Sequence, residues 1–196
     1  MATVDKELNA LIEARVNELL EQRLDALIRE RMTALEKKQV KAKRMAIAVV
    51  SRGTIDAAYS ALILATTAVA LEMEVGVYFS FFGLNILKKG NQDNLKVVPL
   101  GNPAMPVAMP NIVSVLPGMT ALATMMMKRT IQQKKIATVP ELLEAAIESG
   151  VKLWPCQMAM EMFDLKRDDL IDGLPTPVGA ATFLEFAGDA DITLFI

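Results

Sequence analysis

The first 44 residues carry apolar side chains at steps of three and four residues, in a strongly charged segment without proline or glycine. Such spacing gathers apolar side chains along one side of a helix, so it predicts a long amphipathic helix over residues 1–44. A basic cluster closes the segment and suits a helix C-terminus, whose carbonyl groups carry partial negative charge. The apolar positions are Val4, Leu8, Leu11, Ile12, Val16, Leu19, Leu20, Leu24, Leu27, Ile28, Met32 and Leu35, and the basic cluster is Lys37, Lys38, Lys41, Lys43 and Arg44.

A helix of about 38 residues would reach roughly 57 Å, which is too long to lie wholly against so small a domain. Its apolar positions need a partner, and the simplest is the same helix from another subunit in a coiled coil. The alternative is a helix that folds back on its own domain. We therefore expect a homo-oligomer that the N-terminal helix helps to assemble.

Residues 45–196 alternate apolar runs with helical patterns and predict one α/β domain. The apolar run at 45–50 is typical of a strand buried on both faces of a parallel sheet, and an alanine-rich helix at 55–71 and a second strand at 75–82 follow it. Strands separated by helices predict a three-layer α/β/α fold with a mostly parallel sheet. The later elements are predicted as helices at 138–149, 157–163 and 178–187 and strands at 151–154 and 192–196.

Residues 97–127 carry no charge and are rich in methionine, with five prolines that prevent one membrane-spanning helix. One interpretation is a long loop, with a helix near 119–133, packed under the domain or in a subunit interface. A second is an apolar lid or docking surface beside the active site, because methionine side chains adapt readily to different partners. A third is contact with a membrane surface.

Composition narrows the possible chemistry. The chain has 196 residues, a formal net charge of −2 and an isoelectric point of about 5.3, so no nucleic-acid-binding surface is expected. It has no histidine and one cysteine, which excludes a Ser-His-Asp or Cys-His arrangement, an internal disulfide and a cysteine-based zinc site. Charged residues interrupt the N-terminus, so a signal peptide is not predicted and a cytoplasmic protein is expected.

The single cysteine, Cys156, follows a predicted strand and begins a predicted helix. In parallel sheets the carboxyl ends of the strands form the edge where ligands bind. Unpaired N–H groups at a helix start favour a thiolate, which is nucleophilic without a histidine. With no second cysteine, the chain cannot resolve an oxidised thiol by itself. A persulfide carrier, a mixed-disulfide partner and a sulfenate sensor are then the open roles, beside the structural one of a small buried residue.

Several segments of residues 45–196 together resemble the DsrE/DsrF/DsrH-like family. Their order and spacing carry the resemblance, the cysteine motif of the family falls on Cys156, and the N-terminal helix lies outside it. The methionine-rich insertion resembles that of the longer, stand-alone branch. The segments are 51–56 (SRGTID), 79–84 (FSFFGL), 150–158 (GVKLWPCQM), 178–182 (VGAAT) and 194–196 (LFI).

This resemblance implies a three-layer α/β/α fold, homo-oligomerisation and a cysteine that carries sulfane sulfur as a persulfide. It also implies rhodanese-like or TusA-like partner proteins and no cofactor. Relatives are sometimes called peroxiredoxin-like, but the threonine and arginine arrangement of a peroxidatic site is not evident in this sequence.

Other candidate residues lie at the same predicted sheet edge. Arg52, in the first turn after a strand, could hold an anion, and Thr54 is placed to cap the following helix. The acidic residues at 164–172 do not have the spacing of a calcium loop, so no metal is expected. The pocket and anion-binding candidates are Ser51, Arg52, Gly53, Thr54, Phe82, Gly83, Trp154 and Met158.

Two classes of function remain. The leading hypothesis is a sulfur carrier or sulfurtransferase that acts through a persulfide on Cys156, with the choice between an enzyme and a stoichiometric carrier left open. The alternative is a non-catalytic oligomeric scaffold in which Cys156 is a buried core residue. A nucleotide-binding module is disfavoured, because the chain has neither a G-x-G-x-x-G motif nor a P-loop.

Overall fold

The computed structural model describes the backbone of residues 2–39, 43–98 and 118–196, and the side chains of residues 12–33, 43–98 and 118–196. Contacts within the chain divide it into two units, residues 1–42 and 43–196. Each unit is described by itself.

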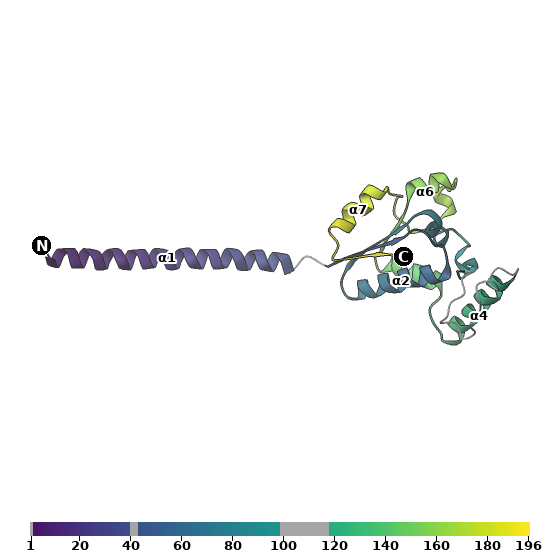
Figure 1. Ribbon diagram of the computed structural model, residues 1–196, viewed down its shortest axis with the longest axis horizontal. Coiled ribbons are helices and arrows are strands. Elements are labelled where there is room, and N and C mark those ends of the chain that lie inside the picture. Colours follow the sequence, from purple (N-terminus) through teal and green to yellow (C-terminus); the bar gives the residue numbers. More distant parts are fainter. Residues whose placement is uncertain (1, 40–42, 99–117) are drawn as a thin grey trace. The chain divides into compact units, whose positions relative to one another are not determined.

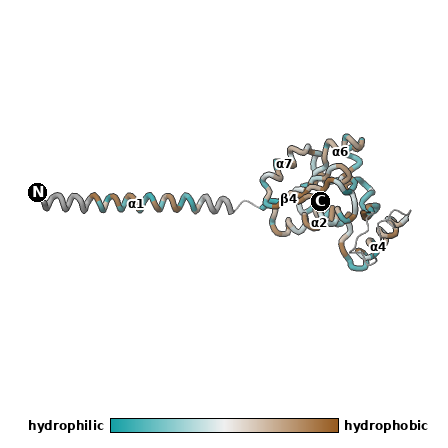
Figure 2. The backbone as a smooth tube through the Cα atoms, in the orientation of Figure 1, coloured by the Kyte–Doolittle hydropathy of each residue, from teal (hydrophilic) through white to brown (hydrophobic). Residues whose placement is uncertain are grey.

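The first unit is one helix, α1 (Ala2–Gln39), of 38 residues (Figure 1). Figure 2 shows hydrophobic and hydrophilic residues alternating along it. Its described apolar side chains are all exposed, and six of them recur at every fourth position: Ile12, Val16, Leu20, Leu24, Ile28 and Met32. A step of four advances the row by roughly 40° around the helix, so the row turns about 200° between residues 12 and 32. One straight neighbouring helix could therefore cover only part of this row.

The second unit is built on a four-stranded sheet in the order β3-β2-β1-β4, and every pair of neighbouring strands is parallel. The two central strands are almost wholly buried, which explains why their sequences are apolar at successive positions. The strands are β1 (Arg44–Val49), β2 (Glu74–Phe79), β3 (Lys152–Pro155) and β4 (Ile192–Phe195).

Helices cover both faces of the sheet, and the three-layer α/β/α fold expected from the sequence is confirmed. Figure 1 shows α2 (Ile55–Ala70) on one side and α6 (Gln157–Met162) and α7 (Ala180–Gly188) on the other. The buried face of α2 consists largely of alanine, which lets the helix approach the strands closely. α5 (Val139–Glu148) packs beside α2. Under α7, Gly76 is required, because a Cβ there would lie 2.5 Å from the Trp154 ring.

The described part of this unit also contains α4 (Met119–Gln133) and the short helices η1 (Phe81–Ile86), η2 (Gln92–Asn94) and η3 (Arg167–Asp169). α4 matches the helix expected near 119–133, and its Thr124 hydroxyl accepts a hydrogen bond from the Val97 N–H at 3.2 Å. The rest of the methionine-rich segment, residues 99–117, lies outside the described residues. The three interpretations of this segment, as a loop, a lid or a membrane contact, therefore stay predictions. In the described part of the chain, no helix is long and apolar enough to cross a membrane.

Two helix starts differ in how they are capped. At α5 a capping box is present: the Thr138 hydroxyl accepts from the Glu141 N–H, and the Glu141 carboxylate accepts from the Thr138 N–H at 2.6 Å. Thr54 is the N-cap residue of α2, but its hydroxyl accepts no helix N–H and lies buried with no hydrogen-bond partner among the described residues. α7 begins at Ala180 rather than at 178, because Val178 pairs with Cys156.

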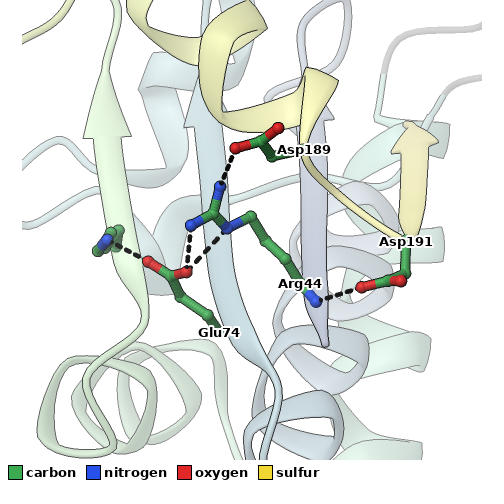
Figure 3. Close-up of polar contacts among 5 residues, drawn as sticks. Arg44, Glu74, Asp189 and Asp191 are labelled. Atoms are coloured by element: carbon green, nitrogen blue, oxygen red, sulfur yellow. Dashed lines mark hydrogen bonds and ion pairs between the residues drawn. The ribbon is translucent and has the colours of Figure 1, made fainter. Parts of the chain in front are cut away.

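A polar cluster joins the amino ends of the strands, opposite the edge where Cys156 lies (Figure 3). The Arg44 guanidinium pairs with Glu74 at 2.7 Å and with Asp189 at 3.4 Å, and its backbone N–H donates to the Asp191 carboxylate at 2.8 Å. Lys152 pairs with Glu74 at 2.5 Å. The hydrogen bond from Lys152, and then that from Arg44, hold the pKa of Glu74 below its ordinary value. The cluster thus fixes the starting positions of all four strands.

Candidate functional site

Cys156 lies directly after β3 and is the N-cap residue of α6. Its N–H donates a hydrogen bond to the Phe79 carbonyl at 2.9 Å, and on its other side the residue forms a parallel bridge with Val178. Its Sγ atom accepts a hydrogen bond from the Ala159 N–H at 3.5 Å. The residue is 5% exposed, so the sulfur lies just beneath the protein surface.

β2 brings two polar side chains to this sulfur. Tyr78 is paired in register with Trp154, and continuing that register places Ser80 beside Cys156 on the same face of the sheet. The Tyr78 phenol interacts with both the Cys156 thiol and the Ser80 hydroxyl. Tyr78 and Ser80 are both buried. The sulfur therefore has a phenol and a backbone N–H as neighbours, and Ser80 interacts with that phenol.

The phenol keeps its proton near neutral pH. Burial, and next the hydrogen bond and charge interaction with Cys156, raise the pKa of Tyr78 above its ordinary value, while Ser80 acts in the opposite direction. The ring is also held firmly, because it stacks on Phe183 of α7 with centroids 4.9 Å apart and planes 12° from parallel. Tyr78 is thus a protonated phenol that is held in place near the sulfur.

Tyr78 and Ser80 were not among the residues predicted from the sequence. The signal that could have found them is strand register. Paired residues on adjacent parallel strands lie on the same face of the sheet. If the strand that ends before Ser80 is paired with the strand that ends before Cys156, Tyr78 and Ser80 lie on the same face as Cys156. Sequence alone did not identify which strands were neighbours.

The first turn after β1, which holds Ser51, Arg52, Gly53 and Thr54, packs against η1. A Cβ on Gly53 would lie 2.1 Å from the Phe82 carbonyl oxygen, and a Cβ on Gly83 would lie 2.3 Å from the Val49 carbonyl oxygen. Both glycines therefore serve close backbone packing at the carboxyl edge.

The structure does not join Arg52 to the cysteine. Its guanidinium is exposed and lies 3.7 Å from the Asp56 carboxylate, one helical turn further along the chain. Among the described residues it makes no hydrogen bond or ion pair with Cys156, and Ser51 is likewise an exposed turn residue.

Aromatic and methionine side chains are exposed beside the cysteine. Phe82 of η1 is 55% exposed, and its ring lies 5.8 Å from that of Phe163, at the end of α6. Met158 of α6 is 67% exposed. Phe81 and Met162 are exposed on the same two elements. η1 and α6 are in contact and Cys156 begins α6, so these exposed apolar side chains lie on elements next to the cysteine.

Trp154, which was expected to flank the cysteine, is buried on the same face two residues earlier. Its ring packs edge-on against Phe186 of α7, with centroids 5.0 Å apart. It lies on the side of the amino-edge cluster, since Lys152 sits 5.9 Å from its centroid.

The chemistry that this site can perform depends on one sulfur atom and the groups around it. Among residues 12–33, 43–98 and 118–196, no three histidine, cysteine or acidic side chains gather closely enough to hold a metal ion. The Ala159 N–H donates to the sulfur, and the Tyr78 phenol interacts with it. Such a site suits nucleophilic exchange at sulfur.

Comparisons with known proteins match this second unit. The model of the DsrE/DsrF/DrsH-like family matches residues 41–195. Sulfur carrier protein DsrE2 of Allochromatium vinosum is 44% identical over 163 residues, covering 80% of this chain and 100% of that protein. The uncharacterized protein YrkE of Bacillus subtilis is 31% identical over 166 residues, covering 80% of this chain and 98% of that one. Among solved structures, the ychN protein of E. coli is 11% identical with a TM-score of 0.42, covering 79% of this chain and 99% of that chain.

Proposed function

Because the chain belongs to the DsrE/DsrF/DrsH-like family, we propose that it is a sulfur carrier that holds sulfane sulfur as a persulfide on Cys156 and passes it to a partner protein. The observation that carries the proposal is the setting of Cys156. The only sulfur nucleophile of the chain lies at the carboxyl edge of the sheet, between the Tyr78 phenol and the Ala159 N–H.

The transfer is a balanced thiol–persulfide exchange. The Cys156 thiolate attacks the outer sulfur of a donor persulfide, R–S–SH. The S–S bond of the donor breaks, a new S–S bond forms at Cys156, and the donor leaves as the thiolate R–S⁻. A partner thiolate then attacks the outer sulfur on Cys156, which leaves as a thiolate. No net oxidation occurs, so the exchange consumes neither an oxidant nor a second cysteine of this chain.

The neighbouring groups support both halves of this exchange. Cys156 is the leaving group in the second half, and the Tyr78 O–H and the Ala159 N–H stabilise its departing charge. Burial shields the persulfide from adventitious thiols. Burial also means that the sulfur must become accessible for each attack, so exchange in the folded protein should be slower than in the unfolded chain.

The partners that fit this chemistry are rhodanese-like or TusA-like sulfur-transfer proteins in the cytoplasm. The exposed Phe82, Phe163 and Met158 surface would dock them, because apolar and methionine side chains contribute strongly to protein interfaces. We further propose that the protein works as a homo-oligomer of two-part subunits, each with an N-terminal helix and a DsrE/DsrF-like domain.

One observation favours a second candidate, the non-catalytic scaffold. Cys156 is 5% exposed and belongs to the hydrophobic core cluster, as an inert cysteine would. The two candidates differ in whether the folded protein exchanges sulfur at all.

The test is sulfur transfer between proteins. A rhodanese-like domain carrying labelled persulfide is mixed with the full chain and then with a TusA-like acceptor, and each protein is analysed for label. We expect label on the full chain and then on the acceptor, and neither with Cys156→Ser. Equal loading of the acceptor by the wild type and by Cys156→Ser would contradict the carrier role and favour the scaffold.

A further inference from the structure

Among the described residues, no further strand pairs with the outer edge of β4. β4 borders β1 on one side only, because it is the last strand of the sheet. Ile196 donates to the Ala48 carbonyl at 2.9 Å and accepts from the Val50 N–H, so its backbone groups face β1. In a parallel strand, the N–H and C=O groups of successive residues point alternately to one neighbour and to the other. The groups of Thr193 and Phe195 therefore point to the outer edge of β4.

The opposite edge of the sheet is protected. β3 begins with Lys152 and ends with Pro155, and a charged residue and a proline are two common means by which edge strands avoid pairing. The bridge between Cys156 and Val178 also covers the carboxyl end of that edge. Residues 192–196 (ITLFI) contain no charged side chain, proline or glycine.

β4 carries exposed apolar side chains. Phe195 is 77% exposed and Ile192 is 43% exposed. Phe195 is paired in register with Ala48 and therefore lies on the face of α7, whereas Leu194, paired with Ile47, lies on the opposite face. Exposed apolar side chains and open backbone groups coincide on this one strand, which is the combination that sheet extension requires.

A second copy of β4 fits this edge in one register. When two copies run antiparallel about a two-fold axis at Leu194, Thr193 of each copy lies opposite Phe195 of the other. The outward N–H and C=O groups of these residues then form four hydrogen bonds. On the other face Leu194 meets Leu194, and Ile192 meets Ile196. Every cross-strand pair on that face is aliphatic.

We propose that β4 is an interface with a second copy of this chain, in which the two sheets join edge to edge as one continuous sheet. The second copy is favoured over an unrelated strand because the apolar pattern is complementary to itself about Leu194. A pairing of this length is at the small end of specific interfaces, so the association through β4 is a weak one. It does not depend on the role of Cys156.

The test is register-specific cross-linking of the full chain, in a Cys156→Ser background so that only introduced thiols react. The proposed register places the two Leu194 Cα atoms about 4.5 Å apart, within disulfide range. The two Ile192 Cα atoms would be four residues out of register, roughly 13 Å apart. Diamide supplies the oxidising equivalents, and non-reducing electrophoresis measures the rate.

We expect Leu194→Cys to cross-link about tenfold or more faster than Ile192→Cys, because only the former meets disulfide geometry. An equimolar mixture of Ile192→Cys and Ile196→Cys should again cross-link rapidly. Adding Phe195→Lys to Leu194→Cys should abolish the rapid reaction, whereas adding Ile136→Lys, at an exposed apolar residue before α5, should not. Circular dichroism of each variant checks folding.

Three results would overturn the proposal. Equal rates for Leu194→Cys and Ile192→Cys would mean random collision. If Phe195→Lys leaves the cross-linking rate of Leu194→Cys unchanged, the contact between copies does not involve the proposed β4 pairing. A folded Leu194→Cys variant that fails to cross-link, with slow hydrogen exchange at Thr193 and Phe195, would show that another segment covers β4. Each readout is separate from sulfur transfer, so failure here leaves the carrier role standing.

Discussion

At the scale of single residues, Cys156 has polar neighbours from another strand and from the helix that it begins. Tyr78 supplies a buried O–H from β2, and Ala159 supplies an N–H from the turn that follows the sulfur. A hydrogen bond to a thiolate favours the charged form. The rate at which the folded protein reacts with an alkylating reagent therefore reports on Tyr78.

Tyr78→Phe should slow alkylation of Cys156 at neutral pH by roughly threefold to tenfold, because the lost hydrogen bond to the charged sulfur is worth about 1 kcal/mol. The matched control is Tyr59→Phe, which removes a phenol hydrogen bond of 2.8 Å to the Ala137 carbonyl. Both variants should lose similar stability in urea. Equal alkylation rates in Tyr78→Phe and wild type would remove Tyr78 from the site.

Glu74 gives a pH-dependent prediction. Its pKa in the folded protein lies below its ordinary value of 4.5, through the hydrogen bonds of Lys152 and Arg44. The stabilisation is thus fully present above pH 4.5 and is lost as the pH falls through the folded-state pKa. Because the carboxylate is partly exposed, we expect Glu74→Gln to lower the free energy of unfolding by only about 1 kcal/mol at neutral pH.

Urea unfolding at a series of pH values measures this effect. The difference between Glu74→Gln and wild type should shrink toward zero in acid. Asp172→Asn, which removes an exposed ion pair with Lys89 of 3.0 Å, should show little difference at any pH. If Glu74→Gln lowers the free energy of unfolding by the same amount in acid, side-chain packing and not the charge of Glu74 stabilises the cluster.

At this scale the sequence predicted the position of Cys156 well but not its surroundings. The strand that precedes it and the short helix that follows could be recognised from local patterns. Tyr78 and Val178 come to the cysteine through strand order, and Phe183 comes to Tyr78 through helix packing. Local patterns do not encode either. Arg52 was placed at the correct sheet edge, but its guanidinium pairs with Asp56 of the helix that follows.

At the scale of elements, the carboxyl edge is organised by contact between the first turn and η1. Gly53 has no room for a side chain, since a Cβ would lie 2.1 Å from a backbone oxygen of η1. Gly53→Ala should therefore cost about 1–3 kcal/mol in urea unfolding. Gly188→Ala, in α7, meets no atom within 4 Å and should be neutral or slightly stabilising. Equal stability of the two variants would contradict the close packing of this turn.

The elements themselves were largely predictable. The apolar strands, the alanine-rich α2 and the capping box of α5 each have a local cause, and each lies within a few residues of its predicted bounds. η1 was not predicted, because the aromatic run at 79–82 continues past the end of β2 in sequence. Gly83 ends that run with a tight turn over β1.

At the scale of the whole molecule, the chain consists of two units with different composition. The family model begins at residue 41, and residues 43–196 contain the hydrophobic core cluster. We therefore expect a protein truncated to residues 43–196 to unfold cooperatively, with a melting temperature close to that of the full chain. Circular dichroism on heating measures this. A truncated protein without a cooperative transition would show that the domain needs the helix.

The role of α1 is the part that the sequence could not settle. Steps of three and four suggested a coiled coil, but a row at every fourth position turns around the helix rather than staying on one side. A partner that crosses α1 at an angle would suit such a row better than one that runs alongside it. The coiled coil remains a prediction.

The central claim is that the folded protein carries sulfur on Cys156. The most direct measurement is the intact mass of the folded full chain after incubation with a sulfane-sulfur donor, beside Cys156→Ser and a urea-unfolded sample. We predict that the wild type gains the mass of one sulfur atom, that a reductant removes it, and that Cys156→Ser gains none. A folded wild type that gains nothing, while the unfolded chain is modified, would contradict the claim and make Cys156 a core residue.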